Sequence, residues 1–183
     1  MGSPGKENKG HQQDVKSPGP ILLGLGANLS SPTHGSPVAT LEAALRRLEA
    51  MGLVIVARSR WWESAPIPVS DQPWYVNGVV EVATDRQPEP LLALLHEVEG
   101  EFGRVRSYPN APRVLDLDLL AYEAVVRQGP KPPLLPHPRL AERAFVLLPL
   151  REVEPGWRHP VSGRSLSEMI RALPSGQIVR PLP

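Results

Sequence analysis

The chain of 183 residues contains no cysteine. This absence excludes a thiol nucleophile, a disulfide framework and metal sites built on thiolates. The net charge is only +1, so no bulk electrostatic field favours nucleic acid or a membrane surface, and any basic site must be local. No apolar run reaches the roughly 18 residues that a membrane span requires, and the N-terminus lacks the apolar core of a signal peptide. We therefore expect a cytoplasmic protein with neither a nucleic-acid nor a membrane partner.

Length and composition predict one folded domain between two tails. Residues 1–19 are rich in glycine, proline, lysine, glutamine and serine and hold almost nothing apolar, which is typical of disorder. Residues 20–173 carry the periodic apolar segments and are numerous enough for a hydrophobic core. We expect residues 174–183 to be a loose C-terminal tail. The 23 prolines are concentrated between the periodic segments, where they rigidify loops.

The segment Arg113–Leu120 alternates acidic and apolar residues, which is the period of a half-buried β-strand. Asp116 and Asp118 would share one face of this strand, while the leucines around them would enter the core. Two carboxylates about 7 Å apart along a strand can hold one or two Mg²⁺ ions and leave room for substrate phosphates. The alternative is an ordinary solvated strand face, which is the commoner case for an isolated pair.

Basic residues beside the acidic strand favour the metal interpretation. Three arginines occupy this region: Arg104, Arg106 and Arg113. Guanidinium groups bind phosphate in a bidentate manner. Carboxylates for a metal next to guanidinium groups for phosphate are what nucleotide chemistry requires.

The order of predicted elements indicates the fold class. Apolar periodicity predicts a strand over Ile21–Leu25, a helix from Ser36 to Gly52, strands over Leu53–Glu63 and Tyr75–Thr84, a helix over Pro90–Phe102, and then the acidic strand. This is the split βαβ, or ferredoxin-like, βαββαβ pattern. We therefore predict an α+β fold whose antiparallel sheet carries these helices on one face.

Two later segments are predicted to be helical: Arg139–Leu150, as one partly irregular helix, and Ser165–Leu173. They would cover the other face of the sheet and give three layers, α/β/α. In the second of them, Ser165 and Glu168 have the spacing of a capping box.

Several polar residues could recognise a second ligand. Tyr75 and Asn77 share one face of their strand, and a ring beside an amide suits a flat heterocycle. A surface pair without a ligand is an equally good interpretation. Gly26 and Asn28 mark a tight strand exit at which a ligand or another backbone approaches closely.

Further charged residues could contact a nucleotide. His96 and Glu99 are three residues apart and so lie on one face of their helix. That face is either solvated or turned toward a nucleotide. His137 stands between two prolines and could complete a phosphate clamp with Arg143, although a lone histidine is more often structural or exposed.

Six short motifs follow one another in a fixed order. They are Leu25-Gly26-Ala27-Asn28-Leu29, Asp71-Gln72-Pro73-Trp74-Tyr75-Val76-Asn77, Gly103-Arg104-Val105-Arg106, Pro112-Arg113-Val114-Leu115-Asp116-Leu117-Asp118, Pro136-His137-Pro138-Arg139-Leu140 and Arg143-Ala144-Phe145-Val146-Leu147-Leu148-Pro149-Leu150. Each motif alone is weak, but the six in order, with compatible spacing, are specific. From about Ile21 to about Leu173 the chain resembles the 6-hydroxymethyl-7,8-dihydropterin pyrophosphokinase family of folate synthesis.

The resemblance implies an enzyme that moves the diphosphate of ATP onto the hydroxymethyl group of 6-hydroxymethyl-7,8-dihydropterin and releases AMP. It implies two Mg²⁺ ions held by Asp116 and Asp118, and these two aspartates act with Arg104 and Arg113 as the catalytic group. The implied pterin contacts are Gly26, Ser64, Ala65, Ile67, Tyr75, Asn77 and Phe145. The implied nucleotide contacts are His96, Glu99, Arg106, Arg113, Leu119, His137 and Arg143. We expect the protein to act as a monomer.

Two other functions stay open at this stage. A ferredoxin-like sheet can serve as a ligand-binding module without catalysis, since a fold does not fix a function. Another Mg²⁺-dependent phosphoryl or nucleotidyl transferase would keep the acids and arginines but would have no use for Tyr75, Asn77 and Phe145 around a heterocycle. Pterin-dependent release of AMP separates the three.

Overall fold

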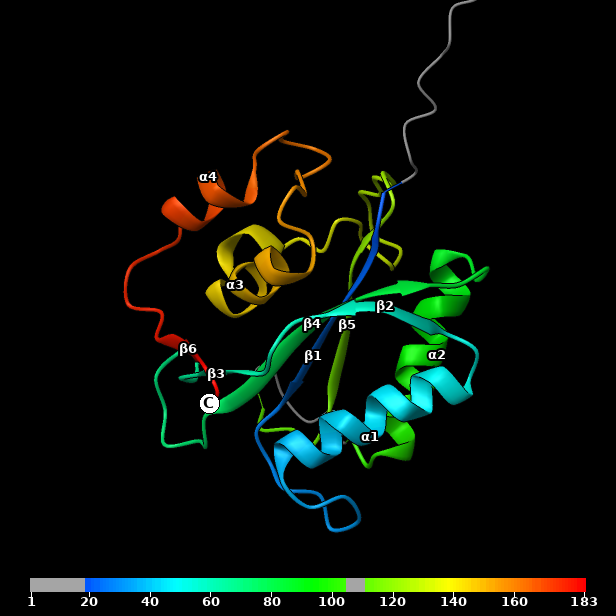
Figure 1. Ribbon diagram of the computed structural model, residues 1–183, viewed down its shortest axis with the longest axis vertical. Helices are drawn as coiled ribbons and strands as arrows, with labels where there is room; N and C mark the ends of the chain where they lie inside the picture. The colour runs from blue at the N-terminus through cyan, green and yellow to red at the C-terminus, as the bar shows by residue number, and fades with distance from the viewer. Residues whose placement is uncertain (1–18, 105–110) are drawn as a thin grey trace, which may run out of the picture.

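The computed structural model describes residues 19–104 and 111–183. Its elements follow in chain order (Figure 1): β1 (Ile21–Ala27), α1 (Pro37–Ala50), β2 (Val54–Arg58), β3 (Trp62–Ser64), β4 (Tyr75–Ala83), α2 (Pro88–Glu101), β5 (Asp116–Tyr122), the short 3₁₀ helix η1 (Leu140–Glu142), α3 (Ala144–Val153), α4 (Leu166–Arg171) and β6 (Val179–Pro181). No helix in these described residues is long and apolar enough to cross a membrane.

Within the described residues, one sheet contains all six strands, and every pairing in it is antiparallel. The strand order is β5-β1-β4-β3-β6, and β2 also pairs with β4. Strand β1 therefore lies between the acidic strand β5 and the long strand β4. The predicted α+β class and the antiparallel sheet with helices are confirmed.

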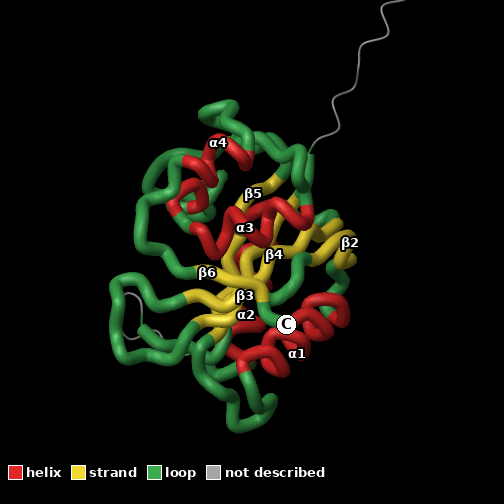
Figure 2. Tube along the Cα trace, turned by 60° about the vertical axis from the view of Figure 1, so that its left-hand side comes forward, coloured by secondary structure: helices red, strands yellow, loops and turns green. Residues whose placement is uncertain are grey.

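Successive residues along strands β1 and β5 face two different cores. Leu23 and Leu25 of β1 belong to a large core, which we call the first core, together with buried leucines of α1 and α2. Leu22 of β1 and Leu120 of β5 belong to a second core with residues of α3 and α4. Figures 1 and 2 show α1 on one side of the sheet and α3 with α4 on the other.

The helices begin and end where local chemistry allows. Ser36 caps α1, because its hydroxyl accepts a hydrogen bond from the Ala39 amide at 3.3 Å. The chain leaves α1 through Gly52, whose φ of +94° suits a residue without Cβ. The predicted capping box at α4 is confirmed, with Ser165 and Glu168 exchanging their hydrogen bonds.

The single strand predicted over Leu53–Glu63 is wrong, because the chain breaks it into β2 and β3. Between the two strands the Ser59 hydroxyl accepts the Val79 amide at 3.0 Å and takes the place of a ladder bond. The Trp61 ring lies over Gly78, where an added Cβ would come 2.5 Å from the ring. The glycine therefore admits the tryptophan that turns the chain out of the ladder.

The segment Arg139–Leu150, predicted to be one partly irregular helix, is irregular over its first half. It is divided into η1 and α3 at Arg143, whose backbone is extended at φ −112° and ψ 111°. This break places the Arg143 side chain and Phe145 at the start of α3, and both are only partly buried.

The loose tail expected after Leu173 is not loose throughout. Residues Val179–Pro181 form β6, which pairs with β3 in the register Val179 opposite Ser64. Its Arg180 pairs with Glu63 and lies over the Trp74 ring at 5.1 Å. Cross-strand bonds of this kind depend on the partner strand and leave no local signal in such a short segment.

Candidate active site

The acidic pair lies on the edge strand β5, on the same face of the sheet as the second core. In the register of the sheet, Asp118 is opposite Gly24 and Asp116 is opposite Gly26. Gly26 is in turn opposite Asn77 of β4. The order Asn77, Gly26, Asp116 therefore crosses three neighbouring strands, and the middle position carries no side chain.

That missing side chain leaves a space between an amide and a carboxylate. A Cβ placed on Gly26 would lie 3.4 Å from Asn77 Oδ1 and 3.9 Å from Asp116 Cβ. The Asn77 amide is fixed in orientation, because its Nδ2 donates to the buried Ser64 hydroxyl at 2.9 Å. Asn77 itself is 5 % exposed, so its carbonyl oxygen faces the floor of the space rather than bulk water.

The two predicted aromatic contacts come from different parts of the fold. Tyr75 is two residues before Asn77 on β4, and its hydroxyl lies 3.4 Å from the Ala111 carbonyl oxygen. Phe145 is in the first turn of α3 and packs against the second core. The Arg143 guanidinium lies over the Phe145 ring, 5.5 Å from its centre. That same guanidinium is 3.6 Å from Asp118 Oδ2, so Phe145 is joined to the acidic pair through one arginine.

Asp116 is held between two of the predicted arginines. Arg104 pairs with its Oδ1 and Arg113 with its Oδ2, the latter at 2.8 Å. All three side chains are mostly buried, with between 16 % and 24 % of each exposed. The two guanidinium groups therefore neutralise the carboxylate, which would otherwise repel a phosphate.

Burial shifts the pKa of Asp118 and the pKa of His137 in opposite directions, because it favours the neutral form of both side chains. Burial raises the pKa of Asp118 to about 6, and the neighbouring charge of Asp116 acts in the same direction. Burial lowers the pKa of His137 to about 4, with Arg143 and Arg139 adding to the effect. His137 is therefore neutral at pH 7. Its Nδ1 accepts the Arg139 amide at 3.1 Å, which leaves the proton on Nε2 as a donor.

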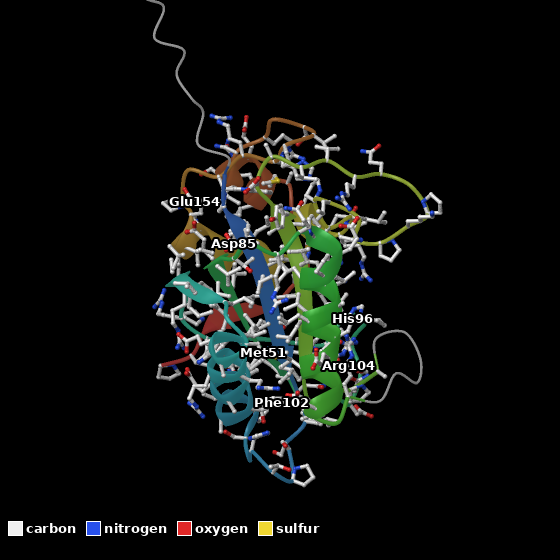
Figure 3. All side chains as sticks on the ribbon, turned by 90° about the vertical axis from the view of Figure 1, so that its right-hand side faces the viewer. Met51, Asp85, His96, Phe102, Arg104 and Glu154 are labelled. Atoms are coloured by element: carbon white, nitrogen blue, oxygen red, sulfur yellow. The ribbon has the colours of Figure 1, made fainter. Side chains whose placement is uncertain are left out.

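Glu99 and His96 do not share an environment, although they lie on one helix. Glu99 is 2 % exposed, accepts the Leu117 amide at 2.7 Å and pairs with Arg104. His96 is exposed. Figure 3 shows Arg104 just after the end of α2 and His96 further back along the same helix. The solvated-face interpretation is therefore wrong for Glu99, which holds the acidic strand and Arg104 against α2.

The other predicted residues fall into three groups. The side chain of Leu119 lies in the first core and is 4 % exposed, so only its main chain could meet a nucleotide. Arg106 lies outside the described residues. Ala65, Ile67 and Arg143 line one cavity of about 380 Å³, which is closed on another side by residues 174–178.

Asn28 has a structural role that the sequence only hinted at. Its Oδ1 accepts the Arg113 amide at 2.8 Å, and its Nδ2 donates to the Pro73 carbonyl oxygen at 3.1 Å. Its backbone amide also donates to the Arg113 carbonyl oxygen at 3.0 Å. The predicted close approach of another backbone at this strand exit is confirmed. The amide bridges the loop before β4 and the segment before β5, two loops distant in sequence.

The donor set of the site fits a hard divalent cation bound together with phosphate. Asp116 and Asp118 offer oxygen ligands on one strand face, next to two glycines of β1. Among the described residues, no group of three or more His, Cys, Asp or Glu side chains could hold a metal ion. A cation here would take few ligands from the protein and would need others, which is the usual arrangement for Mg²⁺ carried with a nucleotide.

The chain is similar to known proteins in sequence and in fold. Residues 22–155 match the family model described as 7,8-dihydro-6-hydroxymethylpterin-pyrophosphokinase. The 2-amino-4-hydroxy-6-hydroxymethyldihydropteridine pyrophosphokinase of Methylorubrum extorquens is 38 % identical over 84 % of this chain and 94 % of its own length. The enzyme of the same name from Pseudomonas aeruginosa is 37 % identical over 87 % of this chain and 95 % of its own length.

Other relatives are longer than this chain. The folic acid synthesis protein fol1 of Pneumocystis carinii is 32 % identical over 89 % of the chain, which spans only 21 % of that protein. A crystal structure of Plasmodium falciparum HPPK-DHPS is similar with a TM-score of 0.60 over 84 % of this chain and 42 % of its own. At 12 % identity this likeness shows the fold alone.

Proposed function

The chain belongs to the 7,8-dihydro-6-hydroxymethylpterin-pyrophosphokinase family, and from this premise we propose how its own residues bind ATP and a pterin alcohol and transfer diphosphate between them. The products are AMP and the diphosphorylated 6-hydroxymethyl-7,8-dihydropterin. The observation that carries the proposal is the row Asn77, Gly26, Asp116 across three strands. In this row an amide, an open space and an acid lie side by side on one face, which supports an amide contact to a heterocycle beside a carboxylate for a metal.

We propose that this chain has a ferredoxin-like core in three layers. The order β5-β1-β4-β3 supports it, if β2 and β3 are counted as the two parts of one bent strand. The separate cores on the two faces of the sheet support the layering. In this arrangement the acidic strand is at an edge, where loops can enclose a ligand.

The pterin would lie over Gly26. Asn77 offers it a fixed amide, with Ser64 holding that amide in place, and buried amides of this kind discriminate strongly among heterocycles because any group left unpaired is costly. Tyr75 and Phe145 would supply the faces of the ring slot. The main chain at Ser64, Ala65 and Ile67 would form its side wall.

Asp116 and Asp118 would hold two Mg²⁺ ions. When bound, the ions would neutralise the triphosphate and stabilise the charge that moves between the attacking and leaving oxygens. Asp116 is available for this only if Arg104 and Arg113 give up their present bonds to it. We propose that those guanidinium groups turn from Asp116 to the phosphates when the nucleotide binds. Before that, their ion pairs with Asp116 would keep both arginines in the site.

His137 and Arg143 would complete the phosphate contacts. His137 presents a neutral Nε2–H donor, because its Nδ1 is occupied by the Arg139 amide. Arg143 is a partly buried cation beside Asp118. His96, Glu99 and the main chain of Leu119 would lie toward the rest of the nucleotide, with Glu99 acting through Arg104 rather than by direct contact.

The test is an incubation with ATP, Mg²⁺ and 6-hydroxymethyl-7,8-dihydropterin, followed by separation of the nucleotides. We expect AMP that forms only when the pterin is present. Formation of ADP would identify a single-phosphate kinase, and absence of any turnover with retained pterin binding would identify a binding module. A reaction without the pterin controls for ATP hydrolysis.

We also propose that one chain forms a complete site, since the acids, the arginines, the amide and the two rings all come from it. A monomer is therefore sufficient for the reaction. The cytoplasmic location and the lack of a nucleic-acid partner are proposed on the composition alone.

A further inference from the structure

The C-terminal segment Gln177–Pro181 joins two walls of the site. On one side, Val179 pairs opposite Ser64 of β3, and the Ala65 amide donates to the Ile178 carbonyl oxygen at 3.1 Å. On the other side, the segment reaches the break between η1 and α3. Residues after 155 lie beyond the part of the chain that the family model matches.

Gln177 makes the contact with that break through both ends of its amide. The Ala144 amide donates to Gln177 Oε1 at 2.8 Å, and Gln177 Nε2 donates to the Glu142 carbonyl oxygen at 2.8 Å. The residue between these two contacts is Arg143. One side chain therefore bonds the backbone on both sides of the arginine that faces Asp118.

These two bonds replace a cap that α3 lacks. The first amides of a helix have no partner inside it, and Arg143, at the cap position, makes no side-chain bond to them. Gln177 satisfies the Ala144 amide in its place. Because Arg143 has extended backbone angles between a 3₁₀ helix and an α-helix, a second fixed point on Glu142 holds that bend as well.

We infer that Gln177 is a positioning residue for pterin binding, which fixes Phe145 and Arg143 relative to the wall formed by Ser64 and Ala65. The inference rests on the proposed function. Gln177 need not touch a substrate. It sets the width of the slot, because the same short segment is bonded to β3 on one side and to the start of α3 on the other.

The test replaces Gln177 by methionine, which has nearly the same length and volume but can make neither bond. We expect the Kd for 6-hydroxymethyl-7,8-dihydropterin, measured by calorimetry with Mg²⁺ and a non-hydrolysable ATP analogue, to rise about tenfold, since two neutral hydrogen bonds are lost. The Kd of the ATP analogue alone should rise less than threefold, because Arg143 is the one proposed phosphate contact that Gln177 holds, while Arg104, Arg113 and His137 keep their own contacts. Turnover at saturating pterin should stay within threefold of wild type.

A matched control is Gln87→Met, at the start of α2, where the glutamine is exposed and makes no capping bond with its side chain. It should leave both Kd values within twofold. Gln177→Glu keeps an acceptor for the Ala144 amide and loses the donor to Glu142, so its pterin Kd should fall between wild type and Gln177→Met. This variant also decides the matter if Gln177→Met does not fold.

A pterin Kd within twofold of wild type in folded Gln177→Met, or an equal weakening of pterin and ATP analogue, would overturn the inference. Hydrogen exchange at the Ala144 amide gives a readout that needs no substrate. If the wild type formed no pterin-dependent AMP, the proposed function would fail by itself. Faster exchange at Ala144 in Gln177→Met would still support the positioning of the junction, and unchanged exchange would refute it.

Discussion

The two faces of one sheet differ sharply although the same strands build both. On the face toward α1 and α2, β1 contributes Leu23 and Leu25, and β5 contributes Leu117 and Leu119, all of them buried. On the opposite face, β1 contributes Gly24 and Gly26, and β5 contributes Asp116 and Asp118.

This difference shows how stability and function are divided. The apolar face removes large side chains from water and supplies much of the favourable free energy of folding. The part of the other face that lies beyond the second core contains few packed apolar side chains and instead carries charged groups and an open space at Gly26. Because side chains alternate along a strand, one strand contributes to the core with one face and to the charged site with the other. Mutations should therefore be able to change stability and activity separately.

The largest separation should come from the acidic pair. Asp116→Asn or Asp118→Asn removes a charge that we propose holds the metal, and we expect turnover to fall about 10³-fold. The pterin Kd should change less than about threefold, because the proposed ring slot is formed by other residues. Steady-state kinetics and calorimetry give the two numbers. Asp85→Asn, an exposed aspartate before α2, is the control, and wild-type turnover in either site variant would remove the pair from the mechanism.

The converse change is in the first core. Leu95→Ala removes a fully buried side chain of α2, and we expect the free energy of unfolding to fall by about 3 kcal/mol. Turnover measured well below the melting temperature should stay within about twofold. Urea unfolding followed by circular dichroism measures the free energy of unfolding. Leu92→Ala, at a half-buried position on the same helix, should lower that free energy clearly less. A loss of turnover in Leu95→Ala without a loss of stability would contradict the separation of stability and activity between the two faces.

A smaller effect is expected from filling the space at Gly26. The methyl group of Gly26→Ala would lie 3.4 Å from Asn77 Oδ1 and 3.9 Å from Asp116 Cβ, so the folded protein has room for it. It occupies the place proposed for the pterin, and we expect the pterin Kd to rise about tenfold with little change in melting temperature. Gly100→Ala, where an added Cβ meets nothing within 4 Å, is the control. Unchanged pterin binding would show that the ligand lies elsewhere.

The smallest effect is in the pH dependence of stability without ligand, where two groups of the charged face act in opposite directions. The folded pKa of His137 is about 4, below the ordinary value of 6.5. The unfolded chain therefore binds more protons between pH 4 and 6.5, and this group makes stability rise with pH over that range. The folded pKa of Asp118 is about 6, above the ordinary 3.8, so this group makes stability fall as pH rises from about 4 to 6.

Single substitutions should expose each contribution. Asp118→Asn should steepen the rise of the unfolding free energy from pH 4 to 6.5, and His137→Gln should flatten or reverse that rise. In each variant the total change in unfolding free energy over this pH range should differ from that of the wild type by on the order of 1 kcal/mol, after allowance for solvent screening. Urea unfolding at several pH values measures the slopes. Parallel curves for both variants and the wild type would show that neither group titrates as its burial indicates.

The sequence predicted the features that depend on local periodicity. Alternation along β5 correctly placed Asp116 and Asp118 on one face, and the helix predicted from Ser36 does begin there, with Ser36 as its cap. The chain order of strands and helices was enough for the fold class. The motifs were enough for the family.

Features that depend on distant partners could not be predicted in the same way. Glu99 reads as part of an exposed helix face until the Leu117 amide and Arg104 are seen beside it. The break at Arg143 has no helix-breaking residue, and the glutamine that stabilises it is 34 positions later. The bend between β2 and β3 depends on Gly78 of another strand. Each of these is decided by a contact that the local pattern does not contain.

Asn28 has a mechanical consequence for the two halves of the site. Its side-chain carbonyl oxygen accepts a hydrogen bond from the Arg113 amide, and its side-chain amino group donates one to the Pro73 carbonyl oxygen. One rigid planar group therefore connects the segment that carries Arg113, which we propose binds phosphate, with the loop that leads to Tyr75. Neither loop can move outward on its own without breaking its hydrogen bond to Asn28. A ligand that immobilises one loop therefore lessens the freedom that the other ligand must still remove.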